Sequence, residues 1–295
     1  MCRKRLNMYN TFTPYLYLLP ALLIMIIFVF IPLFQALIYS FQDYNIITPP
    51  RWIGLKNYQG LLNDPVFYKS LVNTVIYFAG VVPVLIVLPL FMGILVNKKV
   101  AGIKFFRAAF YLPVVTSMVV AGITWKWIYA DTGILNYFLQ HILRVAKEPI
   151  YWLSSPNTAL YAVMAVTVWK GLGYYMVIYL AGLQAISTDI WEAALIDGAT
   201  GLKKHFRITI PLLAPSMAVV AIMSSMAAMK VFDEIYVMTG GGPFNSSKTV
   251  VYHLYEAAFT NLRMGYASAI GFVLFAILLV FSLISIKISE HNYEV

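Results

Sequence analysis

Long runs of apolar residues, separated by shorter polar segments, dominate the pattern along this chain. A helix needs about 20 apolar residues to cross a hydrocarbon core about 30 Å thick. Six runs have this length, and they occupy residues 15–39, 71–96, 108–130, 158–183, 211–231 and 266–288. Because lipid offers no hydrogen-bond partners to backbone N–H and C=O groups, each run should form an α-helix. The pattern therefore predicts an all-α polytopic membrane protein with six transmembrane helices.

The composition supports this class. Of 295 residues, 61% are hydrophobic and only 11% are charged, whereas a soluble domain carries about 25% charged residues. The first run is too long for the apolar core of a secretory signal and lacks a small-residue cleavage site, so we expect an uncleaved first helix. Cys2 is the single cysteine of the sequence, which excludes an internal disulfide and a cysteine-based metal cluster.

Much of the basic charge lies in three segments on the same side of a six-span chain, and the net charge is +9. The basic residues of these segments are Arg3, Lys4, Arg5, Lys98, Lys99, Lys104, Arg107, Lys203, Lys204 and Arg207. The positive-inside rule assigns their side to the cytoplasm. We therefore expect a transmembrane domain at 15–288, flanked by a cytoplasmic N-terminal segment at 1–14 and a cytoplasmic tail at 289–295. The positive charge orients the chain in a lipid bilayer, and we expect no nucleic-acid partner.

Motifs for nucleotide binding and hydrolysis do not occur in the sequence. It contains no G-x-x-x-x-G-K-[ST] loop, no H-E-x-x-H pair and no G-x-S-x-G elbow. The glycine-rich run Thr239–Pro243 is not followed directly by Lys-Ser/Thr, so it predicts a flexible turn rather than a phosphate site. We expect a non-catalytic membrane subunit that holds no metal and no cofactor of its own.

A short charged segment at 187–211 separates the fourth and fifth runs. Asp189 is a candidate helix cap with Glu192 in capping-box position, and Gly198 offers a turn out of the helix. One face of this helix is apolar and consists of Ile190, Trp191, Ala194, Leu195, Gly198, Ala199 and Leu202. Lys203–Arg207 form a polar stretch before the next span. Such a helix suits either a membrane surface or the docking of a cytoplasmic partner, and composition does not separate the two.

The residues of this segment resemble a known motif. Glu192-Ala193-Ala194 is followed by three residues, Gly198, nine residues and Ile208-Thr209-Ile210-Pro211. This is similar to the EAA loop, EAA-x3-G-x9-I-x-L-P, of the inner-membrane permease subunits of binding-protein-dependent ABC importers. Other stretches look like the carbohydrate-uptake permeases of the maltose and glycerol-3-phosphate type, namely residues 54–58, 70–74, 169–175, 181–184, 197–199 and 239–243.

The resemblance implies that the segment between the fourth and fifth spans is a coupling helix, seated in a cleft of a cytoplasmic ATPase subunit. The coupling residues on this pattern are Glu192, Ala193, Ala194, Asp197 and Gly198. ATP and Mg²⁺ would then be bound by a dimer of the partner ATP-binding subunit. The resemblance also implies a second, related permease subunit, an extracytoplasmic solute-binding protein and a small-molecule carbohydrate substrate, and it places this chain in the inner membrane.

Lys170 marks a candidate solute site, because it lies about 12 residues into the fourth run and so near the bilayer midplane. A charge at that depth usually faces a bundle interior or a wet cavity. Neighbours on the same helical face offer hydroxyls, an aromatic ring and close backbone approach, which suit a sugar or a sugar-like polyol. The family pattern adds residues of the fifth run. The substrate-binding candidates are Thr167, Lys170, Gly171, Tyr174, Ser224 and Ala228.

Other interpretations stay open at this level. One is that Lys170 pairs with a carboxylate for structural reasons, although Asp233 and Glu234 should lie too high, near the outer end of the fifth run. Another is an ion-coupled secondary transporter, which should carry acidic residues within its spans, and the runs contain essentially none. An ABC permease for a glycerol phosphate or another non-sugar solute, and a membrane subunit without transport activity, are further alternatives.

Overall fold

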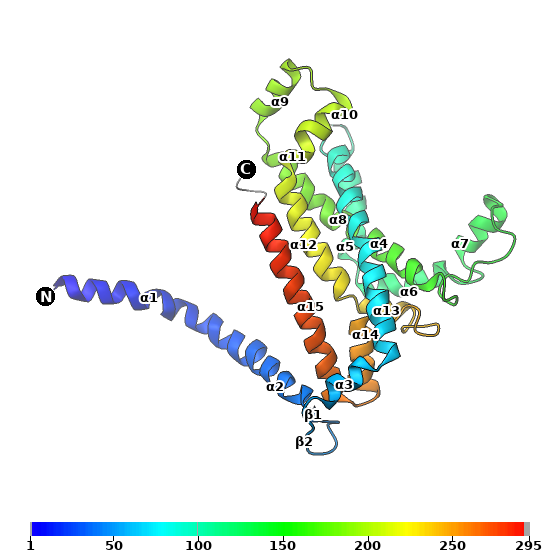
Figure 1. Cartoon of the computed structure of the whole chain (residues 1–295). Coiled ribbons are helices and arrows are strands. Elements are labelled where there is room, and N and C mark those ends of the chain that lie inside the picture. Colours follow the sequence, from blue (N-terminus) through cyan, green and yellow to red (C-terminus); the bar gives the residue numbers. More distant parts are fainter. Residues whose placement is uncertain (1, 99, 292–295) are drawn as a thin grey trace. The chain divides into compact units, whose positions relative to one another are not determined.

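The structure is a computed structural model, and most of it is helical (Figure 1). It describes the backbone of residues 2–98 and 100–291 and the side chains of residues 13–98, 100–285 and 287. The side chains of Cys2, Arg3, Lys4 and Arg5, residue Lys99 and the end of the tail at 292–295 lie outside the described residues. The chain divides into two compact units. One contains the chain up to Asp64 with Leu254–Leu274, and the other contains Pro65–His253 with the chain from Phe275 onward.

The first unit begins with a long helical stretch. It consists of α1 (Cys2–Met25), the π-helical turn η1 (Ile26–Phe30) and α2 (Ile31–Ser40). Within it, Thr13–Ser40 is long and apolar enough to cross a membrane, and it contains the predicted run 15–39. Two antiparallel strands, β1 (Gln42–Asp43) and β2 (Arg51–Trp52), follow with Gln42 opposite Trp52. Helix α3 (Lys56–Leu62) comes next, and η4 (Glu256–Thr260) with the first part of α15 (Met264–His291) completes the unit.

Polar side chains fix the turn after α2. The side-chain amide of Asn57 donates hydrogen bonds of 2.9 Å to the carbonyl oxygens of Ser40 and Gln42. The Tyr58 hydroxyl donates to the Ser40 hydroxyl over 2.8 Å. These bonds satisfy buried groups at a helix end that would otherwise lack partners, and they account for the Asn-Tyr pair at the start of α3.

The second unit is a helical bundle in which α4 (Pro65–Val96) packs against α8 (Ala159–Ala185) and α12 (Ala214–Met229), and Figure 1 shows the three side by side. Side chains buried in this core include Tyr77, Val81, Val163, Val166 and Val220. Helix α5 (Ile103–Val115) also packs on α8. Burial of these faces against one another stabilises the unit and leaves the outer faces of the bundle apolar.

Helices α5 and α8 approach each other closely at Gly173. A Cβ atom at this position would lie 2.1 Å from the carbonyl oxygen of Phe110 and 2.9 Å from its carbonyl carbon. Glycine is therefore required here by the space between two backbones. The close approach brings the C-terminal end of α5 beside the middle of α8, where the candidate solute residues lie.

The third predicted span is not one helix. Helices α5 and α6 (Met118–Ile128) meet at 98°, so the prediction of a single helix over 108–130 is wrong. Pro113 lacks a backbone donor, and its ring crowds the preceding turn. Thr116 and Ser117 then adopt extended backbone, with ψ of 134° and 140°, and the chain leaves the helix.

The fifth predicted span is also bent. Helical residues Gly201–Leu212 meet α12 at 68°, since Pro215 has no N–H to donate across the bend. The first part consists of α10 (Gly201–Lys204), the π-helical turn η3 (His205–Thr209) and α11 (Ile210–Leu212). The sequence predicted a polar linker at Lys203–Arg207 and a helix opening at Pro211. This is wrong, because the helix already begins at Gly201.

Among the described residues, four helices are long and apolar enough to cross a membrane, or up to six if each bent pair is one span. The all-α class predicted from the apolar runs agrees with this structure. The count of six crossings stays a prediction.

The connections between these helices are short ordered elements. They are α7 (Ile134–Tyr137), the π-helical turn η2 (Phe138–Ile142), α9 (Thr188–Ile196), α13 (Asp233–Met238) and α14 (Val250–Tyr255). The glycine-rich run after α13 forms a turn, as predicted from sequence, and hydrogen bonds hold it in place. The Ser247 hydroxyl donates to the Gly242 carbonyl over 2.6 Å, and the Asn73 amide of α4 donates to the carbonyls of Asn245 and Lys248.

Candidate functional site

A cavity of about 230 Å³ lies among the helices of the second unit. All six substrate candidates line it, and they are Thr167, Lys170, Gly171 and Tyr174 of α8 with Ser224 and Ala228 of α12. The four residues of α8 follow one another at spacings of three, one and three residues, which places them on one helical face. The structure thus brings together candidates from two separate runs of the sequence. Their role in binding a solute stays a prediction.

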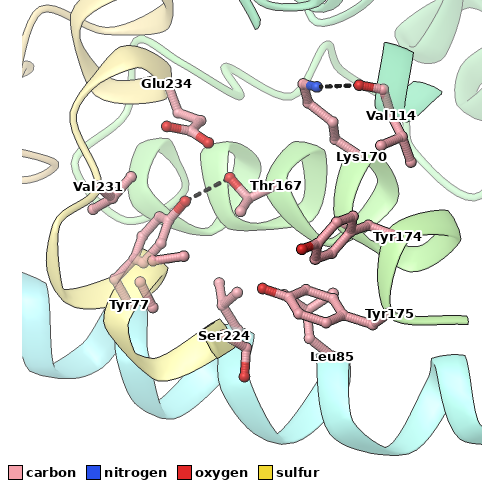
Figure 2. Close-up of a pocket in the computed structure, with 14 residues that line it drawn as sticks. Tyr77, Leu85, Val114, Thr167, Lys170, Tyr174, Tyr175, Ser224, Val231 and Glu234 are labelled. Carbon is pink, nitrogen blue, oxygen red and sulfur yellow. Dashed lines mark hydrogen bonds between the residues drawn. The ribbon is translucent and has the colours of Figure 1, made fainter. Parts of the chain in front are cut away.

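Other residues complete the wall (Figure 2). Helix α4 contributes Tyr77, Val81 and Leu85, the end of α5 contributes Val114, α8 adds Tyr175, α12 adds Ala227, the chain after α12 adds Val231, and α13 contributes Glu234. The cavity therefore has apolar, aromatic and polar surfaces from five helices. This mixture fits a solute that has both C–H faces and hydroxyl groups.

The hydroxyl groups of the wall differ in how far they are already engaged. The Tyr77 hydroxyl is hydrogen-bonded to the Thr167 hydroxyl, and the Ser224 hydroxyl donates to the Val220 carbonyl of its own helix over 2.7 Å. Among the described residues, the hydroxyls of Tyr174 and Tyr175 have no hydrogen-bond partner. Figure 2 shows both in the cavity wall, and their rings meet edge to face with centroids 5.2 Å apart. These two hydroxyls are available to a solute.

Lys170 is bound to the end of a neighbouring helix. Its ammonium group donates to the carbonyl oxygens of Pro113 and Val114, at 3.4 and 3.2 Å. The last carbonyls of an α-helix have no partners within the helix and carry partial negative charge. The bend after α5 exposes such carbonyls, and Lys170 satisfies them. Its hydrogen-bond partners are thus backbone groups, not the carboxylate considered from sequence.

Glu234 faces the cavity, and the expectation that it lies too high is wrong. The chain turns after Lys230, and α13 packs back against α6 and α8. Figure 2 shows its carboxylate directed toward Thr167. Burial raises the pKa of the Glu234 carboxyl, and Asp233 adds to this effect, whereas Lys170 and Thr167 act in the opposite direction.

Sequence reasoning missed Tyr77, Tyr175 and Glu234. Tyr175 has no periodic signal, because it lies about 100° around the helix from Tyr174. Tyr77 belongs to another run and reaches the cavity only through the packing of α4 on α8. The signal that was available for Glu234 is its place in an acidic pair just after an apolar run, where a turn of the chain can direct a side chain back into the bundle.

The candidate coupling residues lie on and after α9. The helix starts at Thr188 after Ser187, which makes no side-chain capping bond. The predicted cap at Asp189 is therefore wrong, and Asp189 lies in the first helical turn. Glu192, Ala193, Asp197 and Gly198 are exposed, whereas Ala194 is only 5% exposed and packs inside the chain.

Gly198 ends α9 in a defined turn. Its φ is +68°, a left-handed conformation that glycine adopts without strain. The Gly198 N–H donates to the Leu195 carbonyl over 3.1 Å, and the Ala199 N–H donates to the Ala194 carbonyl over 2.9 Å. This pair of bonds is the Schellman arrangement of helix ends. Beyond the turn, the Lys204 ammonium lies 4.2 Å from the centroid of the Trp191 ring, which ties α10 to α9.

In the part of the chain that the structure describes, no three His, Cys, Asp or Glu side chains gather into a group that could hold a metal ion. The polar groups of the cavity are hydroxyls, one ammonium and one carboxylate. This arrangement supports binding and positioning of a solute.

A family profile described as "Binding-protein-dependent transport system inner membrane component" matches residues 59–290. The chain belongs to this permease family. The resemblance drawn from the EAA-like segment is therefore confirmed, and with it the class of multi-pass helical membrane proteins. The relatives of this permease are transport components rather than catalytic subunits.

Two relatives cover almost all of the permease. It is 38% identical to the "Probable ABC transporter permease protein YurN" of Bacillus subtilis, over 97% of this chain and 98% of the relative. It is 36% identical to the "Arabinooligosaccharides transport system permease protein AraP" of the same organism, over 94% of this chain and 88% of the relative.

A solved structure shares the fold of the permease. It is a chain of a bacterial alginate ABC transporter in complex with an alginate pentasaccharide-bound periplasmic protein. The TM-score is 0.84 at 22% identity, over 97% of this chain and 96% of the other.

Proposed function

We propose that this permease is the transmembrane subunit of an ATP-driven ABC importer and forms the path for a sugar, an oligosaccharide or a sugar-like polyol. The observation that carries the proposal is the cavity in which residues of α4, α8, α12 and α13 converge. Its two available tyrosine hydroxyls and its aromatic faces match a polyhydroxylated solute. The name of the arabinooligosaccharide relative supports the same class of substrate.

Transport through this cavity would follow alternating access, with the site opening to one side of the membrane at a time. The bend between α5 and α6 follows Val114, which lines the cavity, and the bend before α12 is a second point at which helices can move. The Lys170 ammonium is bonded to the end of α5, so it would follow any movement of that helix. The cavity would thereby change shape as the bundle opens.

ATP hydrolysis would take place in partner subunits. The sequence has no phosphate-binding loop, and α9 presents exposed residues of the EAA-like motif. We assign five residues to the docking of one subunit of an ATP-binding dimer that holds ATP and Mg²⁺. They either contact that subunit or shape the contact surface, and they are Glu192, Ala193, Ala194, Asp197 and Gly198. A second, related permease would meet the other ATP-binding subunit, and an extracytoplasmic binding protein would deliver the solute. Both termini would be cytoplasmic.

Uptake by the reconstituted complex tests the site. Tyr174→Phe removes one available hydroxyl and keeps the ring, so the apparent affinity for the transported saccharide should fall by roughly three- to tenfold, the effect of one lost hydrogen bond. Tyr161→Phe is the matched control, because Tyr161 lies on the same helix, is exposed and does not line the cavity.

The same assay separates the alternatives. Saccharide uptake should require ATP and should persist when ion gradients are collapsed with ionophores. Uptake driven by an ion gradient without ATP would overturn the importer assignment. Uptake of glycerol phosphate but of no saccharide would overturn the substrate class, and an unchanged affinity in Tyr174→Phe would remove this residue from the site.

A further inference from the structure

The cavity contains two opposite charges that are not equally available to a solute. Lys170 and Glu234 are its charged lining residues among those described. The Lys170 ammonium is hydrogen-bonded to two carbonyl oxygens at the end of α5. Figure 2 shows it turned toward Val114, whereas the Glu234 carboxylate is turned toward Thr167. The positive charge is therefore partly neutralised by a helix end, whereas the Glu234 carboxylate lies beside the Thr167 hydroxyl and interacts with Lys170 only through space.

The consequence depends on the charge of the solute. A carboxylate accepts strong hydrogen bonds from hydroxyl groups, so Glu234 suits a neutral saccharide. A saccharide that carries its own carboxylate would bring like charges together in a site where water screens them poorly. Lys170 would offset this repulsion only in part, because two of the three N–H donors of its ammonium group already bond the α5 carbonyls.

We infer that Glu234 is a specificity-determining residue, which selects neutral, hydroxyl-rich saccharides and excludes saccharides that carry carboxylates. The inference rests on the proposed function of the cavity as the solute site. It adds a chemical class to that function and names the residue that sets it. Glu234 contributes this selectivity from α13, outside the two helices to which the sequence assigned the site.

Equilibrium binding to the complete transporter in nanodiscs, without the solute-binding protein, tests the cavity alone. The probes are trigalacturonate and the galactotriose obtained by reducing its carboxyl groups, with arabinotriose as a second neutral saccharide. The wild-type complex should bind the neutral trisaccharides and discriminate against trigalacturonate. Glu234→Gln should reduce this discrimination by about 30-fold, the factor for unit charges about 8 Å apart at an effective dielectric constant of about 20.

Two variants control the measurement. Asp233→Asn makes the same change of charge one residue away, at an exposed position that does not line the cavity, and it should leave the discrimination unchanged. Glu234→Asp keeps the charge and should keep most of the discrimination. Binding of neutral trisaccharides by Glu234→Gln shows that the variant is folded.

The outcomes separate this inference from the proposed function. If the wild type binds the neutral trisaccharides and Glu234→Gln gains no affinity for trigalacturonate, the role assigned to Glu234 is contradicted and the sugar site stands. An equal gain in Asp233→Asn would also contradict it, because the effect would then come from overall charge. If the wild type binds none of the neutral trisaccharides, the proposed function itself is contradicted.

Discussion

The cavity and the α9–α10 segment differ in where their residues find partners. In the cavity, several polar groups are already engaged by other helices of this chain, as Lys170 is by the end of α5 and Tyr77 is by Thr167. In the α9–α10 segment, apolar side chains remain uncovered, with Leu195 58%, Ile196 86% and Leu202 73% exposed. The first region is built to hold its own shape around a small solute. The second exposes a surface whose burial requires another molecule.

The comparison also separates two kinds of glycine. Near the cavity, position 173 requires glycine because there is no room for a side chain: a Cβ there would clash with the α5 backbone. After α9, position 198 favours glycine because of its backbone conformation, since its φ is +68°. Space is not the reason, because a Cβ there would have no contact within 4 Å among the described residues. Substitutions at these two positions should therefore fail for different reasons, which the following predictions use.

The largest effect is expected at Gly198. Gly198→Val places a β-branched residue in the left-handed region, which costs at least about 1–2 kcal/mol and should displace the turn after α9. We expect saccharide uptake to fall by about tenfold or more while the ATPase rate of the complex changes little. Gly198→Asn is the matched control, since asparagine tolerates this conformation, and it should transport nearly as well as wild type. Equal loss in both variants would show that the side chain rather than the turn matters.

A smaller effect on uptake is expected at Gly173. Gly173→Ala forces α8 away from α5, and overpacking of this kind costs typically about 1–3 kcal/mol. The thermal stability of the purified complex should fall, and the affinity for saccharide should weaken because the α5 end beside Lys170 shifts. ATP hydrolysis and transport should remain coupled. Gly60→Ala is a control, because a Cβ there would meet only one atom at 3.9 Å, and unchanged stability in Gly173→Ala would contradict the close helix crossing.

Much of the fold was predictable because hydropathy is a local property. The apolar runs indicated the helices, and the EAA-like spacing of the segment around α9 indicated the permease family. The 98° bend after Val115 was not predicted, since apolar residues continue on both sides of Thr116–Ser117 and hide the break. Pro113 was the one available signal, and proline within a long apolar run does not by itself distinguish a kink from an end.

The residues of the candidate site were predictable where helical spacing alone places them on a common face. Thr167, Lys170 and Tyr174 share a face of one helix, so their grouping follows from the sequence. Tyr77 and Glu234 reach the same cavity only through packing of α4 and the return of α13. The orientation of Lys170 toward the α5 carbonyls depended on the unpredicted bend, which created the free helix end that it binds.

The most direct test of the central claim is photo-crosslinking from α9 in the assembled transporter. A photo-reactive residue in place of Glu192, which is exposed, should form a crosslink to the ATP-binding subunit. The same residue in place of Tyr161, on the exposed face of α8, should not. Absence of any crosslink from position 192 to an ATP-binding subunit, with crosslinks to lipid instead, would contradict the proposal that ATP hydrolysis acts on this permease through α9.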